Sequence, residues 1–110
     1  MSHFANYIKE RQNKEIIEDE SGFATYYFIM PDCYIEDIYV IPEKRKAGIA
    51  AKYADKIAKI AQEKNCLNLI GSVKPTANGS TDSLKVLLAY GFKLHSANED
   101  FIWFKKKLEV

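Results

Sequence analysis

The spacing of apolar side chains predicts that helices and strands alternate along this chain. Apolar residues recur every three or four positions in three segments, of which the second is the strongest: residues 4–12, 47–64 and 81–90. Runs rich in aromatic and β-branched residues, bounded by turn-forming residues, predict strands at residues 16–17, 23–30, 33–40, 66–73, 92–94 and 100–105. The expected fold class is therefore α/β.

The order of these elements predicts a mixed sheet. The first three strands follow one another through short turns and are expected to form an antiparallel meander. The third strand, the long helix and the fourth strand form a crossover, which should be parallel and right-handed. The last helix ends at Gly91 and leads into a hairpin whose turn is expected at residues 96–99. The first helix has a narrow apolar side with Phe4, Tyr7 and Ile8, and should lie on the domain surface.

Length and charge limit the classes of function. A chain of 110 residues with 47% hydrophobic content is expected to form a single domain over residues 1–110. Its 16 basic and 15 acidic residues leave a net charge of +1, which favours neither nucleic acid nor membrane as a partner. The longest apolar stretches fall far below the roughly 20 residues of a membrane span. Because the N-terminus resembles no secretory signal, a cytoplasmic location is expected.

Cys33 and Cys66 are the two cysteines, and both lie within or beside apolar runs. They form no Cys-x-x-Cys pair and have no histidine at metal-ligand spacing. We expect two reduced core residues rather than a disulfide, and no metal.

The segment from Ile38 to Ala50 carries the strongest chemical signal. Here a strand runs through a basic, glycine-containing loop directly into the longest helix. A helix N-terminus exposes unpaired amide groups and partial positive charge, so it favours a phosphate or pyrophosphate group. Gly48 permits close backbone approach. The charges alone fit a solvated loop better, and they would also allow a nucleic-acid contact through Lys44, Arg45 and Lys46.

The order of residues in this loop favours the phosphate interpretation. Arg45-x-x-Gly48-x-Ala50, placed five residues after Val40, closely resembles the Arg/Gln-x-x-Gly-x-Gly/Ala signature of the GNAT acetyltransferases. The resemblance covers most of the chain, up to the step from Gly91 to Phe92. It implies that acetyl-CoA is the acetyl donor, that an amine is the acceptor and that no metal is needed.

The resemblance also implies a set of donor-binding residues. The pyrophosphate would bind to the loop formed by Arg45, Lys46, Ala47, Gly48, Ile49 and Ala50. The pantetheine arm would bind to the backbone of the splayed strand at Ile38, Tyr39 and Val40. Two polar residues before or within the last helix, Asn78 and Ser83, are weaker assignments.

Acetyl transfer to an amine requires the neutral amine, because an ammonium group has no lone pair. With a lysine-like pKa of about 10.4, roughly 1 amine in 2500 is neutral at pH 7, so a positioned base contributes substantially. The resemblance implies Glu36 as this base, with Asp37 ordering a water or binding a cationic substrate. The alternative is that both carboxylates merely face solvent. Strict alternation places Glu36 on one strand face with Ile38, and Asp37 on the other, unless a bulge shifts the phase.

Two departures from the family pattern leave a second function open. The tyrosine that often protonates the departing CoA thiolate is replaced by Leu87, and Tyr90 is the nearest hydroxyl in sequence. The segment before the meander is also short, so the acceptor site should be open or completed by a homodimer partner. The alternative is a GNAT-fold binding or assembly protein with weak or no activity, which would act through exposed strands or through terminal aromatics such as Trp103.

Overall fold

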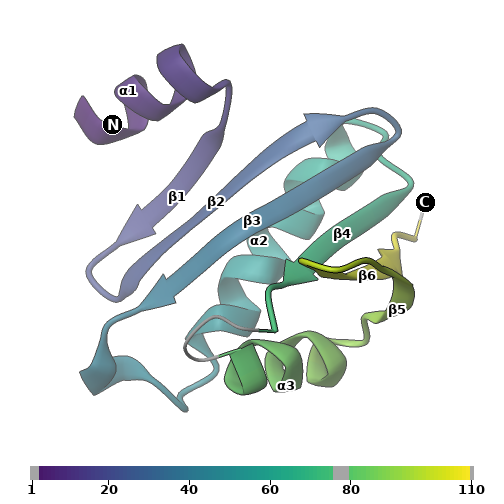
Figure 1. The fold of residues 1–110 in the computed structure, drawn as a ribbon. Helices are drawn as coiled ribbons and strands as arrows, with labels where there is room; N and C mark the ends of the chain where they lie inside the picture. Colours follow the sequence, from purple (N-terminus) through teal and green to yellow (C-terminus); the bar gives the residue numbers. More distant parts are fainter. Residues whose placement is uncertain (1–2, 76–79, 110) are drawn as a thin grey trace.

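A six-stranded mixed sheet with two helices packed on one face organises the chain (Figure 1). The computed structural model describes residues 3–75 and 80–109. Its elements are α1 (His3–Gln12), β1 (Glu15–Asp19), β2 (Gly22–Ile29), β3 (Asp32–Val40), the short 3-10 helix η1 (Pro42–Lys44), α2 (Ile49–Glu63), β4 (Asn68–Val73), α3 (Ser80–Tyr90), β5 (Lys93–Ala97) and β6 (Ile102–Lys107).

The strand order in the sheet is β1-β2-β3-β4-β6-β5. The pairs β1–β2 and β2–β3 are antiparallel, β3–β4 is parallel, and β4–β6 and β5–β6 are antiparallel. The predicted meander, crossover and terminal hairpin are therefore confirmed. The predicted hairpin turn was wrong by two residues, because β5 continues through Ala97. The reason is local: the Asn98 side chain accepts hydrogen bonds from the amides of Asp100 and Phe101, both at 2.9 Å, and so fixes the turn after the strand.

The core lies between the sheet and helices α2 and α3. The largest fully buried side chains are those of Tyr53, Ile57, Leu69 and Cys33. Complete burial of an aliphatic side chain such as Leu69 contributes roughly 1.5–3 kcal/mol to stability. Both cysteines are free and buried, as expected, and burial raises the pKa of the Cys33 thiol to about 12.

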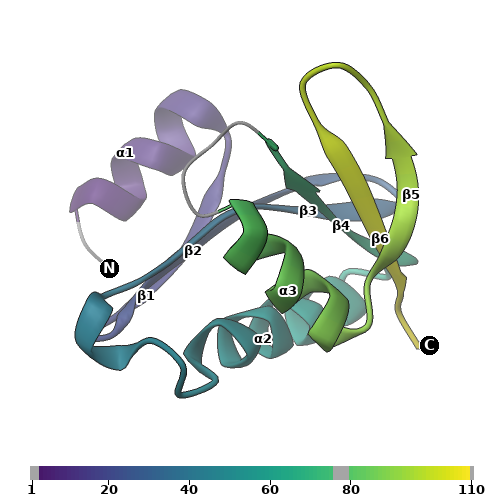
Figure 2. The same cartoon turned by 60° about the horizontal axis from the view of Figure 1, so that its bottom comes forward.

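Helix α1 packs beside β1, on the opposite side of the sheet from α2 (Figure 2). Its buried residues are Ala5 and Ile8, whereas Phe4 and Tyr7 are 49% and 53% exposed. The predicted apolar side of this helix was therefore only partly correct. A short helix that rests mainly on one edge strand buries a single line of residues, and here that line contains the small Ala5 rather than the two rings. Within the described residues, no helix has the length and apolar character to cross a membrane.

Candidate functional site

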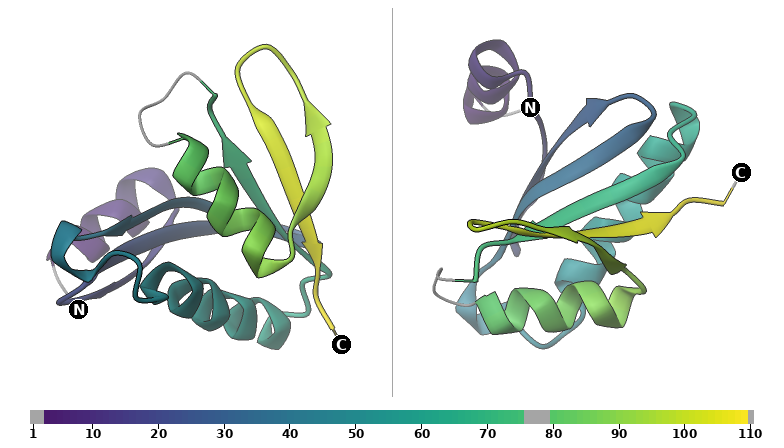
Figure 3. Two further views of the ribbon diagram at one scale, coloured as in Figure 1. Left: turned by 90° about the horizontal axis from the view of Figure 1, so that it is seen from below. Right: turned by 45° about the vertical axis from the view of Figure 1, so that its right-hand side comes forward.

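Strands β3 and β4 pair for only part of their length. Their parallel ladder runs from Asp32 and Asn68 to Ile35 and Gly71, and among the described residues it ends there. Strand β3 continues through Val40 while β4 extends on a different course, so the two strands separate (Figure 3, left). The backbone of residues 36–40 that faces β4 is not part of this ladder. It offers hydrogen-bonding groups beside an opening in the sheet.

A β-bulge lies at the start of this opening. On the other side of β3, Tyr26 pairs with Ile35 and Thr25 pairs with Asp37, so Glu36 is the extra residue. The bulge changes the phase of the strand: Ile35 is buried before it, and Ile38 packs against the same core after it. The expectation that Glu36 shares a face with Ile38 by strict alternation was therefore wrong.

The loop after β3 connects this strand to the N-terminus of α2. The amide of Ile41 donates to the Ser21 carbonyl at 2.8 Å, which fixes the start of this loop to the turn between β1 and β2. Gly48 is the N-cap residue of α2 and has φ of 76°. Within residues 3–75 and 80–109, no side-chain hydrogen bond caps the helix, and its first turn has no acidic residue. A Cβ atom at Gly48 would meet nothing within 4 Å. An anion therefore has both free amide donors and room to approach them.

Arg45 links this loop to the end of β3. Its Nε donates to the Val40 carbonyl at 2.8 Å, and its guanidinium carbon lies 5.7 Å from the centre of the Tyr39 ring. Of the other predicted loop residues, Lys46 and Ala47 are exposed, and Lys46 has φ of 66°. Ile49 and Ala50 are half-buried and form the start of α2. The structure thus brings the predicted loop residues together at one end of the open part of β3.

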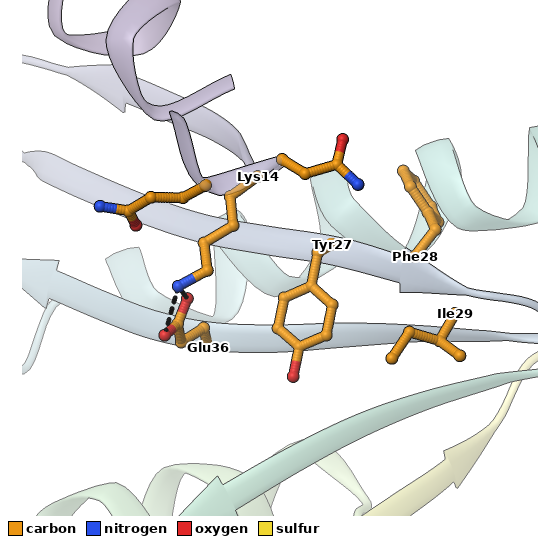
Figure 4. A pocket seen from close by; sticks show the side chains of 7 residues that line it. Lys14, Tyr27, Phe28, Ile29 and Glu36 are labelled. Carbon is orange, nitrogen blue, oxygen red and sulfur yellow. Dashed lines mark hydrogen bonds and ion pairs between the residues drawn. The ribbon is translucent and has the colours of Figure 1, made fainter. Parts of the chain in front are cut away.

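Glu36 faces the side of the sheet opposite α2 and forms an ion pair with Lys14 (Figure 4). The Nζ atom of Lys14 lies 2.7 Å from Oε1 of Glu36 and 2.5 Å from Oε2. The pair lines a hollow of about 300 Å³ together with Tyr27, whose pKa is raised by burial and then by the Glu36 charge. Sequence reasoning missed Lys14, because a single lysine in a polar segment gives no signal of a partner on another strand.

Asp37 lies across from Thr25 on β2. Burial, followed by repulsion from Glu36, raises the pKa of its carboxyl group, while Lys14 acts in the opposite direction. The hydroxyl oxygen of Thr25 is buried and has no hydrogen-bond partner among the described residues. Two neighbouring carboxylates thus differ in environment: Glu36 forms an ion pair with Lys14, whereas Asp37 feels Lys14 only as the weakest of three influences on its pKa.

Tyr90 lies away from Glu36. Its hydroxyl donates to Asp55 on α2 at 2.5 Å, and burial together with this bond raises its pKa. Leu87 instead lies at the strand opening, because a Cβ atom built on Gly71 would be 3.0 Å from its Cδ2. Asn78 lies outside the described residues, and of Ser83 only the backbone, within α3, is described.

Comparison with known proteins identifies the family. The family model described as "Acetyltransferase (GNAT) family" matches residues 7–92. A thialysine N-ε-acetyltransferase from Sus scrofa is 44% identical over 50 residues, which cover 41% of this chain and 29% of that protein. The protein of the same name from Bos taurus is 37% identical over 71 residues, covering 60% of this chain and 42% of that protein. The chain thus spans less than half the length of these curated relatives.

Solved structures show the same fold. The PaiA N-acetyltransferase from Thermoplasma acidophilum, in complex with coenzyme A, has a TM-score of 0.74 at 19% identity, covering 91% of this chain and 65% of that one. An acetyltransferase from Bacillus subtilis in complex with CoA has a TM-score of 0.73 at 15% identity, covering 94% of this chain and 84% of that one. At these identities the likeness establishes the fold. With the family model matching most of its length, the chain belongs to the GNAT family of acetyltransferases.

Proposed function

We propose that this protein transfers the acetyl group of acetyl-CoA to a primary amine by direct attack. The observation that carries the proposal is the coincidence of three features on one strand. The parallel ladder ends at Ile35, the bulge residue Glu36 follows immediately, and the same strand leads into the Gly48 loop at the start of α2. An opening for a long donor, a carboxylate and an anion-binding helix end are therefore consecutive along the chain.

The residues around the loop fit the donor. The uncapped N-terminus of α2 and the open space over Gly48 suit a pyrophosphate, which would satisfy amides that no side chain caps. The backbone of Ile38, Tyr39 and Val40 offers hydrogen-bonding groups for the amide-containing pantetheine arm. Arg45 already contacts Val40 and holds this backbone in place. When bound, acetyl-CoA supplies an activated thioester. We assign Asn78 and Ser83 to donor binding as part of the same proposal.

The carboxylates would prepare the amine. Glu36 accepts a proton from the acceptor ammonium, directly or through a water, and the neutral nitrogen then attacks the thioester carbonyl. Asp37, the next residue of β3, is assigned to hold a water or a second positive group of the acceptor, while Glu36 is the main base. Positioning of the amine against the bound thioester contributes alongside proton removal.

The acceptor class follows from the site and from the relatives. Glu36 and Asp37 present negative charge on the open face of the sheet, so a cationic amine is favoured over a neutral or acidic acceptor. The curated relatives are named as acetyltransferases of an ε-amine on a thialysine. We therefore propose a lysine-like primary amine, either on a small molecule or on a protein.

The test combines binding with turnover. Calorimetric titration with acetyl-CoA should give one site with micromolar affinity, and release of free CoA should depend on an added primary amine. Glu36→Gln should lower turnover at neutral pH by about 100-fold and leave acetyl-CoA affinity unchanged. Glu99→Gln, at an exposed position in the last hairpin, is the matched control and should behave as the original chain. Equal turnover in both variants would exclude Glu36 as the base.

A second candidate is a protein that binds the donor without efficient chemistry. It is favoured by the position of Leu87 at the strand opening and by the engagement of the Tyr90 hydroxyl with Asp55, which leaves neither side chain to protonate a thiolate there. This candidate predicts acetyl-CoA binding with amine-dependent CoA release no faster than in the absence of protein. Replacing Leu87 with Tyr would then raise the rate if thiolate protonation is the missing step.

A further inference from the structure

The ammonium group of Lys14 lies against Glu36, the carboxylate that the proposed reaction uses as its base. Its nitrogen contacts both oxygens of the Glu36 carboxylate, at 2.7 and 2.5 Å. Glu36 is in turn one residue beyond the last β3–β4 pair, at the opening where the thioester would be presented. Lys14 therefore reaches the proposed base from within the same chain.

Local structure fixes Lys14 in this place. Asn13 has φ of 55°, a left-handed conformation that ends α1 and turns the chain towards β1. The amide of Lys14 then donates to the carbonyl of Ile8 on α1, at 3.5 Å. The side chain is only 23% exposed and lies along the hollow beside Tyr27 (Figure 4). Both ends of the lysine are thus held, which lowers the entropic cost of presenting its amine at Glu36.

Lys9 offers a contrast on the same side of the molecule. Its Nζ lies 3.5 Å from one oxygen of Glu15, and its side chain is 61% exposed. An exposed amine of this kind reacts readily with an acetylating reagent in solution. The Lys14 ammonium group contacts both oxygens of Glu36 and belongs to a side chain that is 23% exposed, so it is a poorer target for such a reagent than Lys9.

We propose that Lys14 is an internal acceptor and that the protein acetylates it in cis. The inference rests on the proposed function, since it requires acetyl-CoA bound at the strand opening. Glu36 takes a proton from the Lys14 ammonium, and the free Nζ lone pair attacks the thioester carbonyl. The new N–C bond forms as the C–S bond breaks, and CoA leaves as a thiolate. The nitrogen loses its second proton through solvent, and the thiolate takes up a proton from solvent to give free CoA. The product is N-ε-acetyl-Lys14, which carries no charge.

Acetylation of Lys14 would change the site that performs it. The neutral amide cannot form the ion pair, so the Glu36 carboxylate becomes available to an external ammonium group. The reaction is therefore limited to one acetyl group per chain at this position. Before the modification, an external amine must compete with Lys14 for the Glu36 carboxylate. After it, the external amine finds this carboxylate without a paired cation from Lys14.

The experiment is incubation of the full chain with acetyl-CoA, followed by intact mass measurement and peptide mapping. The expected result is a single added acetyl group, located on Lys14, with a modified fraction at each time that does not depend on protein concentration. Lys14→Arg should abolish the modification while keeping the ion pair, because guanidinium stays charged and is not acetylated. Lys9→Arg, the matched control, should be modified at Lys14 at the original rate.

Glu36→Gln gives the sharpest discrimination from uncatalysed modification. It removes the ion pair and exposes Lys14, so reaction with acetyl-CoA in solution would become faster, whereas catalysed transfer should slow by about 100-fold. Acetylation spread over exposed lysines such as Lys9, or undiminished on Lys14 in this variant, would overturn the proposal.

Failure of the two proposals is distinguishable. If an added amine is acetylated and Lys14 is not, the internal acceptor is excluded and the proposed activity stands. If neither is acetylated, both are excluded.

Discussion

Ile35 of β3 and Gly71 of β4 form the last pair of the parallel ladder, and the next residue of β3 is the bulged Glu36. The opening in the sheet and the placement of the carboxylate therefore start at the same point. The extra residue also restores the inward phase of the strand, so that Ile38 packs against the core while Asp37 remains exposed. The bulge in the β2–β3 pair and the end of the β3–β4 ladder thus coincide along β3, which places the acidic side chains beside the opening.

Gly48→Glu should remove donor binding. The new carboxylate would stand at the uncapped N-terminus of α2, where it would compete with a phosphate for the same amides. Loss of even one or two hydrogen bonds to a charged group corresponds to an affinity loss of about 10-fold to 100-fold or more. Calorimetric titration with acetyl-CoA measures it.

The control for this variant is Gly48→Ala. It imposes the same cost of a side chain at φ of 76° but adds no charge, and a Cβ atom there meets nothing within 4 Å. Its acetyl-CoA affinity should stay within a few-fold of the original, and its Tm should match that of Gly48→Glu. Equal affinity of the Glu variant and the original chain would remove the loop from the donor site.

Gly22→Ala should destabilise the fold strongly. Gly22 has φ of 154°, and a Cβ atom there would lie 1.9 Å from the carbonyl oxygen of Tyr39, which is backbone and cannot rotate away. We expect the free energy of unfolding to fall by about 3 kcal/mol or more, from overpacking and backbone strain. Urea denaturation measures the change. Gly91→Ala should cost less, since the nearest atom is the mobile Lys106 Nζ at 3.1 Å, and a larger cost there would contradict the argument.

Tyr53→Phe should weaken the fold at neutral pH and have less effect in acid. The Tyr53 hydroxyl donates to Asp19 at 2.6 Å, and this bond, followed by the Ser21 amide, lowers the pKa of the Asp19 carboxyl below its ordinary value of 3.8. A group with a lowered folded-state pKa stabilises the fold above the ordinary value, and this contribution is lost as pH falls through the lowered one. The variant should therefore lose a few degrees of Tm at pH 7.

The measurement for Tyr53→Phe is thermal unfolding of both proteins from pH 7 to pH 2. The difference in Tm should be constant down to about pH 4 and should shrink below it. A difference that is the same at every pH would mean that the tyrosine acts through packing alone.

Asp37→Asn should raise stability slightly and lower turnover. Burial and the nearby Glu36 raise the pKa of the Asp37 carboxyl, so the folded chain binds this proton more tightly than the unfolded chain does. The unfolding free energy then falls as pH rises from the unfolded-state pKa to the folded-state one, and the charged form costs stability at neutral pH. Asp37 is only partly desolvated: the residue remains exposed by its surface area, so solvent screens its charge, and removing that charge should gain no more than about 1 kcal/mol.

Thermal unfolding and an amine-dependent CoA-release assay test Asp37→Asn together. Asp100→Asn, at an exposed turn position, should change neither quantity. A variant with unchanged turnover would show that Asp37 neither orders a water nor binds the acceptor.

The order of elements was predictable because it depends on local periodicity. The recurrence of apolar residues through α2 places Tyr53, Ala54, Ile57 and Ala61 on one buried face. The loop from Arg45 to Ala50 was predictable for a similar reason, since a strand, a glycine and a helix start are adjacent in sequence. The residues of α1 that would be buried were predicted less well, because a short helix on an edge strand receives too little packing for periodicity to decide its orientation.

By itself, the sequence determined the family signature, the mixed sheet and the candidate carboxylate Glu36. Tertiary structure alone decided that a bulge places this residue at the strand opening, and that Lys14, 22 residues earlier, lies against it. It also decided that Tyr90 bonds to Asp55 while Leu87 lies over Gly71. The physical reason is the range of the interactions: periodicity and turn chemistry act between near neighbours, whereas strand register, bulges and ion pairs form between segments that only the completed fold brings together.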